Sequence, residues 1–168
     1  KLEMALQLGA THAINTSQSN AGEELARIVG VPDTQVVRGK PSDRKASNIG
    51  HQHGVDVFVE NTGNVSMIEL AYSMTRARVG RTVLVGVPSY DEDISIHTLP
   101  LHFGQVLTGV EGGDTVPGED IPRYLDLYRQ GKLDLDNAVT HRYPLSEINT
   151  AIEKMRHGEV GRCVLSTN

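Results

Sequence analysis

Two apolar runs, each followed by glycine, constrain this chain more than any other feature. Residues 81–88 read RTVLVGVP and residues 55–63 read VDVFVENTG. Nearly unbroken apolar runs rich in β-branched residues are typical of strands that are covered on both faces, as in parallel sheets. With a helix between them, the two runs predict a βαβ unit of a doubly wound α/β fold. Ligands of such sheets bind just beyond the carboxyl ends of the strands, where a glycine permits close approach to the backbone.

Hydrophobic periodicity predicts the remaining elements. Helices are expected over residues 1–8, 21–29, 67–75, 120–130 and 146–156, and strands over residues 10–15, 55–59, 81–87, 105–110 and 162–166. Asp120 and Ser146 are the predicted N-caps of the last two helices. The apolar stripes of these two helices predict buried residues, namely Ile121, Leu125, Leu127 or Tyr128, and then Ile148, Ala151, Ile152 and Met155.

Composition excludes some classes of function. The 168 residues carry 16 Lys and Arg against 21 Asp and Glu, a net charge of −5, which argues against a general nucleic-acid or anionic-membrane binder. No apolar run approaches the roughly 18 residues of a membrane-spanning helix, and the first residues do not resemble a secretory signal. A single cysteine, Cys163, lies in the last apolar strand and is interpreted as an inert buried thiol. We therefore expect a cytoplasmic protein.

Residues 31–53 form a long polar segment punctuated by proline and glycine and locally rich in Arg and Lys. Such a length is unusual for a loop within a compact domain. A phosphate or partner contact is one interpretation, and a solvated excursion is the interpretation that we favour from composition. The first residues already follow a helical pattern without a preceding cap, so we expect further sequence upstream of Lys1.

Several familiar site motifs are missing from the sequence. It contains no G-x-G-x-x-G fingerprint and no acidic ribose ligand after a second strand, and the pattern begins where that second strand would have ended. This predicts a truncated dinucleotide-binding domain. The seven histidines have no Cys or paired carboxylates that complete a metal site, and no G-x-S-x-G elbow is present. Glu60, at the end of the first run, allows a catalytic or a structural role, and we favour structural hydrogen bonding at the sheet end.

Five segments follow one another along the chain: LGATHAIN, GVDVFVENTGN, GRTVLVGVP, LTGVEGG and the tail from Asp120 to Leu165. Their order and spacing resemble the C-terminal half of zinc-type alcohol dehydrogenases of the medium-chain dehydrogenase/reductase family. The resemblance implies an α/β fold: a partial doubly wound, Rossmann-type parallel sheet that lacks its first β-α-β unit, followed by a C-terminal segment of the GroES-like substrate domain. It implies an NAD-binding part over residues 1–113 and a return segment over residues 114–168. Residues 31–53 depart from the family pattern as an inserted loop.

The resemblance also implies which positions bind the cofactor NAD. On the adenosine side, Lys1 matches a lysine that contacts the ribose, and Asn61, Thr62 and Gly63 match the neighbouring strand end. On the nicotinamide side, Val85, Gly86 and Val87 match backbone contacts to the ribose and carboxamide, and Val110 and Gly112 match the strand end beside the ring. Arg162 matches a basic residue that reaches the pyrophosphate. A guanidinium suits that last role because its fork binds phosphate oxygens in a bidentate manner.

By the same resemblance, the function is part of a zinc-dependent oxidoreductase that transfers hydride between an alcohol and the corresponding aldehyde or ketone and NAD(H). The family's zinc ligands and proton-relay groups lie upstream, so no catalytic residue and no metal ligand is assigned here, and the chain alone is expected to be inactive. A homo-oligomer that pairs the edge strand 105–110 is implied. Two alternatives stay open: a zinc-free quinone or enoyl reductase of the same superfamily, and a non-catalytic nucleotide-binding or assembly fragment.

Overall fold

The computed structural model describes residues 1–30 and 54–167 and divides the chain into two compact units. One unit spans residues 14–114, and the other combines residues 1–13 with residues 115–168. No helix among the described residues is long and apolar enough to cross a membrane. The predictions for residues 31–53 lie outside the described part of the chain.

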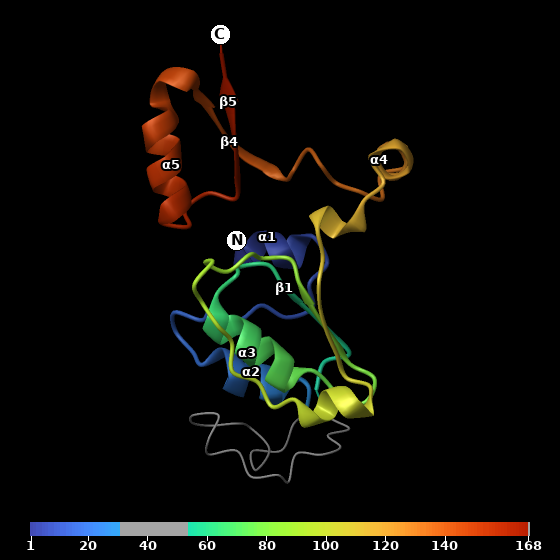
Figure 1. The fold of residues 1–168 in the computed structure, drawn as a ribbon. Helices are drawn as coiled ribbons and strands as arrows, with labels where there is room; N and C mark the ends of the chain where they lie inside the picture. The colour runs from blue at the N-terminus through green and yellow to red at the C-terminus, as the bar shows by residue number, and fades with distance from the viewer. Residues whose placement is uncertain (31–53, 168) are drawn as a thin grey trace. The chain divides into compact units, whose positions relative to one another are not determined.

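The 14–114 unit contains a parallel three-stranded sheet in the order β1-β2-β3 (Figure 1). Its elements are α2 (Ala21–Ile28), β1 (Val57–Glu60), α3 (Val65–Met74), β2 (Arg81–Leu84), the 3-10 helix η4 (Leu99–Phe103), β3 (Val106–Gly109) and the 3-10 helix η5 (Gly112–Asp114). Val57 pairs with Arg81, and Arg81 pairs with Val106, so the three strands start in step. The predicted α/β class with a parallel sheet is confirmed.

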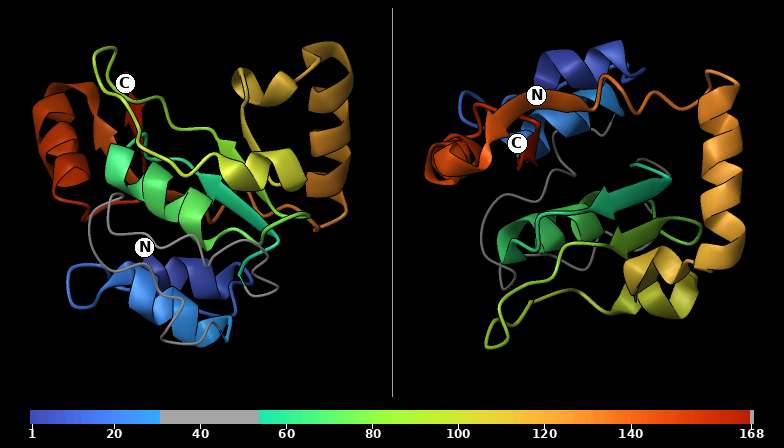
Figure 2. Two further views of the ribbon diagram at one scale, coloured as in Figure 1. Left: turned by 60° about the horizontal axis from the view of Figure 1, so that its bottom comes forward. Right: turned by 90° about the horizontal axis from the view of Figure 1, so that it is seen from above.

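Helix α3 connects β1 to β2 and covers one face of the sheet, as the two further views show (Figure 2). It begins after Asn64, whose side chain accepts a hydrogen bond of 3.2 Å from the Met67 N–H and so caps the helix. Ile68, Ala71 and Tyr72 are buried on its inner face. These side chains form much of the core of the unit.

The other face of β1 is open, which corrects the prediction that both faces are covered. Val57 and Val59 are 58% and 57% exposed, whereas Glu60, on the α3 side, is buried. The alternation arises because α3 packs on one face of the strand, whereas the side chains on the opposite face remain exposed. Successive side chains of a strand point to opposite faces, so every second residue stays exposed.

The second unit contains another β-α-β arrangement. Its elements are α1 (Leu2–Gln7), α4 (Pro117–Arg129), β4 (Val139–Pro144), the 3-10 helix η6 (Leu145–Glu147), α5 (Ile148–Arg156) and β5 (Arg162–Ser166). Strands β4 and β5 are parallel, with Val139 opposite Arg162 and a register irregularity before His141. The last strand, β5, begins and ends where the sequence predicted it, at residues 162 and 166.

Several sequence predictions for the helices of this unit are wrong in detail. Helix α4 begins at Pro117, because proline is already set for the first helical position, and the Asp120 carboxylate accepts the Val116 N–H (2.9 Å) from within the first turns. Helix α5 follows a 3-10 turn and has no side-chain cap, so Ser146 is not its N-cap. Of the residues expected to be buried in these two helices, only Ala151 is buried.

Helices α4 and α5 both carry the predicted apolar stripe, but most of its side chains remain exposed. Ile121 and Leu125 are 53% and 43% exposed on α4, and Ile152 and Met155 are 38% and 53% exposed on α5. Apolar periodicity therefore predicted the helices correctly, because it reports a face suited to burial. It does not supply the surface that would cover that face. Residues 10–15, predicted to be a strand, form none, since no described strand pairs with them.

Candidate functional site

At the carboxyl ends of β1 and β2, two backbone segments, 61–63 and 86–88, lie in direct contact. A Cβ atom built on Gly86 would lie 2.6 Å from the Thr62 nitrogen and 2.7 Å from the Asn61 carbonyl carbon, and closer still to the Gly63 nitrogen. A Cβ built on Gly63 would lie 2.6 Å from the Val87 carbonyl carbon. Only glycine fits at these two positions, because each Cα faces backbone of the other segment. We call residues 61–63 and 86–88 the crossing loops.

Glu60 connects both crossing loops. Its backbone carbonyl accepts hydrogen bonds from the Val85 N–H (2.7 Å) and the Gly86 N–H (3.0 Å), which ends the β1–β2 ladder and turns the chain after Leu84. Its carboxylate accepts the Thr62 N–H (2.7 Å), the Thr62 hydroxyl and the Gly63 N–H (3.0 Å). The structural role that the sequence favoured for Glu60 is thus confirmed.

The electrostatics of Glu60 follow from these bonds. Only 2% of the residue is exposed, and burial by itself disfavours the charged carboxylate. The hydrogen bonds from the Thr62 hydroxyl, the Thr62 N–H and the Gly63 N–H oppose this effect and outweigh it, so the pKa of Glu60 is held below its ordinary value. The carboxylate is therefore a buried anion whose charge is stabilised by donors of one loop.

Beside this buried centre, the crossing loops expose a surface that a ligand can reach. Asn61 and Thr62 are exposed, and the apolar side chains of Val85 and Val87 are 48% and 88% exposed. Exposed polar residues next to exposed apolar residues suit a ligand that combines polar and flat apolar parts. The location is the edge of a parallel sheet at which ligands of doubly wound folds bind.

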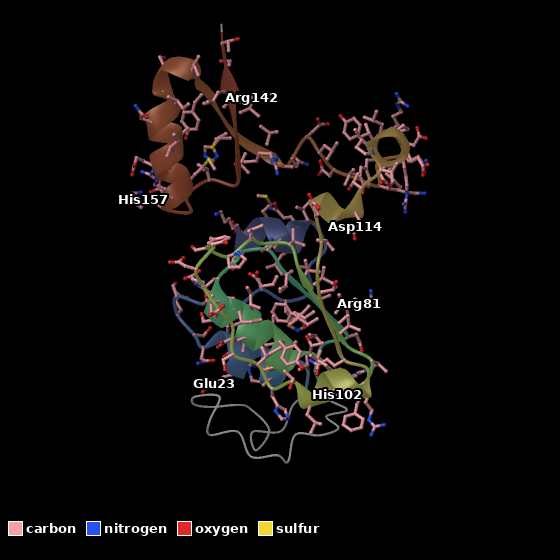
Figure 3. All side chains as sticks on the ribbon, in the orientation of Figure 1. Glu23, Arg81, His102, Asp114, Arg142 and His157 are labelled. Atoms are coloured by element: carbon pink, nitrogen blue, oxygen red, sulfur yellow. The ribbon has the colours of Figure 1, made fainter. Side chains whose placement is uncertain are left out.

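The end of β3 continues this edge. The Val110 N–H donates to the Leu84 carbonyl at 3.1 Å, so Val110 lies directly beside the end of β2. Gly112 has a positive φ of 58°, and nothing lies within 4 Å of a Cβ built there. Figure 3 labels Asp114 after β3 and His102 before it, at opposite ends of the unit, so the carboxyl edge is the end marked by Asp114.

Eight of the ten predicted cofactor-binding residues thus come from one edge of one sheet, at the ends of β1, β2 and β3. The other two, Lys1 and Arg162, lie in the second unit: Lys1 precedes α1, and Arg162 begins β5. Their place relative to the three-stranded sheet is not determined (Figure 1). The assignment of all ten to a cofactor remains a prediction.

The sequence did not reveal how Glu60 holds the crossing loops together. An acidic residue at the end of an apolar strand, followed by Asn, Thr and Gly, was the available signal. That pattern suggests a carboxylate that accepts N–H groups of the following turn. The backbone contact between Gly63 and Gly86 had no such signal, because it joins residues 23 positions apart only once β1 and β2 are paired.

The described residues contain no group of three or more His, Cys, Asp or Glu side chains that is able to hold a metal ion. The crossing loops offer a metal ion only backbone groups and the Thr62 hydroxyl, besides the Glu60 carboxylate, whose two oxygens already accept hydrogen bonds. These residues therefore do not fit zinc, which needs four strong donors or three and a water.

Comparison with known proteins gives this site a context. The family described as zinc-binding dehydrogenase matches residues 1–130. Alcohol dehydrogenase 2 of Zea mays is 33% identical over 167 residues, which cover 98% of this chain and 44% of that protein. Alcohol dehydrogenase 1 of Pisum sativum is 32% identical over 160 residues, covering 94% of this chain and 42% of that protein. The chain thus spans less than half the length of these relatives.

Solved structures agree with the sequence relatives. Benzyl alcohol dehydrogenase from Acinetobacter calcoaceticus aligns with a TM-score of 0.76 at 27% identity, over 98% of this chain and 39% of that one. An alcohol dehydrogenase zinc-binding domain protein from Burkholderia ambifaria aligns with a TM-score of 0.74 at 28% identity, over 98% of this chain and 38% of that one. Because the family match covers most of its residues, this chain belongs to the zinc-binding dehydrogenase family.

Proposed function

We propose that this chain supplies the nicotinamide-cofactor edge of an oxidoreductase that transfers hydride between an alcohol and its aldehyde or ketone. The observation that carries the proposal is the backbone contact that Gly63 and Gly86 allow at the carboxyl ends of β1 and β2. Family membership and the alcohol dehydrogenases among the relatives support the reaction class. NAD is the cofactor that we propose, and hydride transfer is the chemistry that it supplies when bound.

The residues of this chain act by binding and orienting. The cofactor would contact the exposed residues Asn61, Thr62 and Val87. Val110 extends the same edge beside the end of β2. An apolar contact from Val87 would hold a flat ring and keep water from one of its faces, which favours hydride transfer over side reactions. No zinc-dependent step is assigned to the described residues, because they do not fit a zinc centre.

A fluorescence titration tests the proposal. NADH is titrated into the purified protein, as its gene encodes it, and binding is followed by the emission of the nicotinamide. Saturable binding, together with absorbance of NADH formed from NAD and a panel of primary and secondary alcohols, would support the proposal. Binding without turnover would favour a non-catalytic nucleotide-binding role. If neither NADH nor NADPH binds, the proposal is refuted.

Assembly and location belong to the same proposal. Strand β3 is at the end of the sheet order, and no strand of the described residues pairs with its outer edge, which makes this edge a candidate for pairing with another copy of the chain. Pairing of two β3 strands predicts a dimer, which light scattering would detect. We also propose a cytoplasmic location, which cell fractionation with an antibody to the protein would test.

A further inference from the structure

Glu60 is hydrogen-bonded to both crossing loops, and every oxygen of its buried carboxylate accepts a hydrogen bond. Both of its oxygens accept hydrogen bonds, from Thr62 on one oxygen and from the Gly63 N–H on the other. With 2% of the residue exposed, it cannot contact a substrate or take up a proton from one. A direct catalytic role is thereby excluded. What remains is the effect that the carboxylate has on the loops around it.

The two kinds of bond at Glu60 differ in what they depend on. The bonds from Val85 and Gly86 go to its backbone carbonyl, so any residue at position 60 provides them. The bonds from Thr62 and Gly63 go to its side chain, and only a carboxylate of this length offers acceptors on both oxygens. The side chain therefore controls one crossing loop directly and leaves the strand ladder intact.

The position of the second crossing loop depends on the first through backbone contact. Gly86 packs against the Thr62 and Gly63 nitrogens, and Gly63 packs against the Val87 carbonyl carbon and the Pro88 nitrogen. Backbone atoms at such separations cannot move independently. A displacement of the Thr62–Gly63 segment is therefore transmitted to the backbone that carries the exposed Val87 side chain.

We propose that Glu60 is a positioning residue for the nicotinamide cofactor: its carboxylate holds residues 62–63, and through them residues 86–87, in the arrangement that binds the cofactor. The inference rests on the function proposed above. In Glu60→Gln one acceptor oxygen becomes an NH2 group, so either Thr62 or Gly63 loses its acceptor while the side chain keeps its size. The variant changes the hydrogen bonding of the loop and little else.

The test compares NADH affinity and local amide behaviour in matched variants of the protein as its gene encodes it. Glu69→Gln is the control, because the Glu69 carboxylate also accepts one backbone N–H, that of Ser95 (2.7 Å), but lies on α3 away from the crossing loops. Affinity is measured by NADH fluorescence where each variant is fully folded. Hydrogen exchange of the amides of residues 62–63 and 86–87 is measured on the same samples without NADH.

We expect Glu60→Gln to raise the NADH dissociation constant about tenfold or more, the size of one lost charge-assisted bond. Exchange at residues 62–63 and at residues 86–87 should become faster, and Glu69→Gln should match the wild type in both measurements. Unchanged NADH affinity in Glu60→Gln, or faster exchange at residues 62–63 alone, would overturn the inference. A wild type that binds no cofactor refutes the proposed function, whereas the exchange data still decide whether Glu60 holds both loops.

A second pair of variants keeps the test decisive if Glu60→Gln does not fold. Thr62 is exposed, so its replacement carries little risk to the fold. Thr62→Val removes the hydroxyl that donates to Glu60 and accepts the Asn64 N–H (3.1 Å), and Thr62→Ser retains both bonds. The inference predicts faster exchange at residues 86–87 for Thr62→Val and near-wild-type exchange for Thr62→Ser. Exchange without NADH is the readout for this pair, because Thr62 is itself a proposed cofactor contact. Equal behaviour of the two variants would overturn it.

Discussion

Replacement of Gly86 by alanine tests the crossing loops most sharply, because the effect is purely one of contact. Gly86 does not have the positive φ that alanine would resist, so backbone strain plays no part. The new Cβ would lie 2.6 Å from the Thr62 nitrogen, whereas ordinary contact begins at 3.4 Å. That nitrogen would therefore have to move by about 0.8 Å, and the closer Gly63 nitrogen by more. Neither atom belongs to a flexible side chain that could rotate away.

The cost can be estimated from the bonds that such a movement breaks. Overpacking costs about 1–3 kcal/mol. If the Gly86 segment shifts away to relieve the contact, loss of the bonds from the Val85 and Gly86 N–H groups to the Glu60 carbonyl adds about 1 kcal/mol each. We expect the free energy of unfolding to fall by about 3–5 kcal/mol in Gly86→Ala, and the melting temperature to fall by about 6–20 °C. Urea denaturation followed by circular dichroism measures the first quantity directly.

The matched control is Gly109→Ala, a glycine at the end of the adjacent strand β3. Nothing lies within 4 Å of a Cβ built on Gly109, and its φ is not positive. We expect a change in unfolding free energy within about 0.5 kcal/mol, or slight stabilisation. Equal stability of Gly86→Ala and Gly109→Ala would refute the direct backbone contact between the two crossing loops.

Three further predictions follow from the same unit. Gly63→Ala combines a backbone clash with a positive φ of 71°, so thermal melting should show a loss of stability that exceeds that of Gly86→Ala. Because the pKa of Glu60 lies below its ordinary value of 4.5 in the folded state, its charge stabilises the fold above that pH, and this contribution is lost as the pH falls through the folded pKa. The stability gap between wild type and Glu60→Gln, measured by urea denaturation, should therefore be full at pH 7 and shrink below pH 4.5, and a constant gap would contradict this. The buried Thr75 hydroxyl donates to the Ala71 carbonyl and accepts from the Thr82 hydroxyl. Thr75→Val should therefore lower the free energy of unfolding by about 1–3 kcal/mol, because it leaves the buried Thr82 hydroxyl without an acceptor, whereas Thr82→Val should be nearly neutral. Urea denaturation measures both changes, and a larger loss in Thr82→Val would contradict this assignment.

Local sequence signals predicted the elements of this fold well and their surroundings poorly. The strand 81–87 was recognised from its apolar run, but it ends at Leu84 because the next two N–H groups turn toward the Glu60 carbonyl. The exposure of Val57 and Val59 was not predictable, since a run of apolar residues indicates a face fit for burial and not what covers it. Helices α4 and α5 illustrate the same limit.

The candidate site shows a similar division. Glycines after strand ends are visible in the sequence, and the apolar runs before them predict a ligand-binding role for positions 63 and 86. Their mutual contact is a consequence of strand pairing, with Glu60 opposite Leu84, and no local pattern encodes it. The role of Glu60 in joining the loops follows only when both strand ends are seen together.

The central claim is that the crossing loops form part of a nicotinamide-cofactor site, and hydrogen exchange with and without saturating NADH tests it most directly. The account predicts that NADH slows exchange mainly in peptides that contain residues 61–63, 85–87 and 110–112. Protection confined to other parts of the chain, or no change at any peptide under saturating NADH or NADPH, would contradict it.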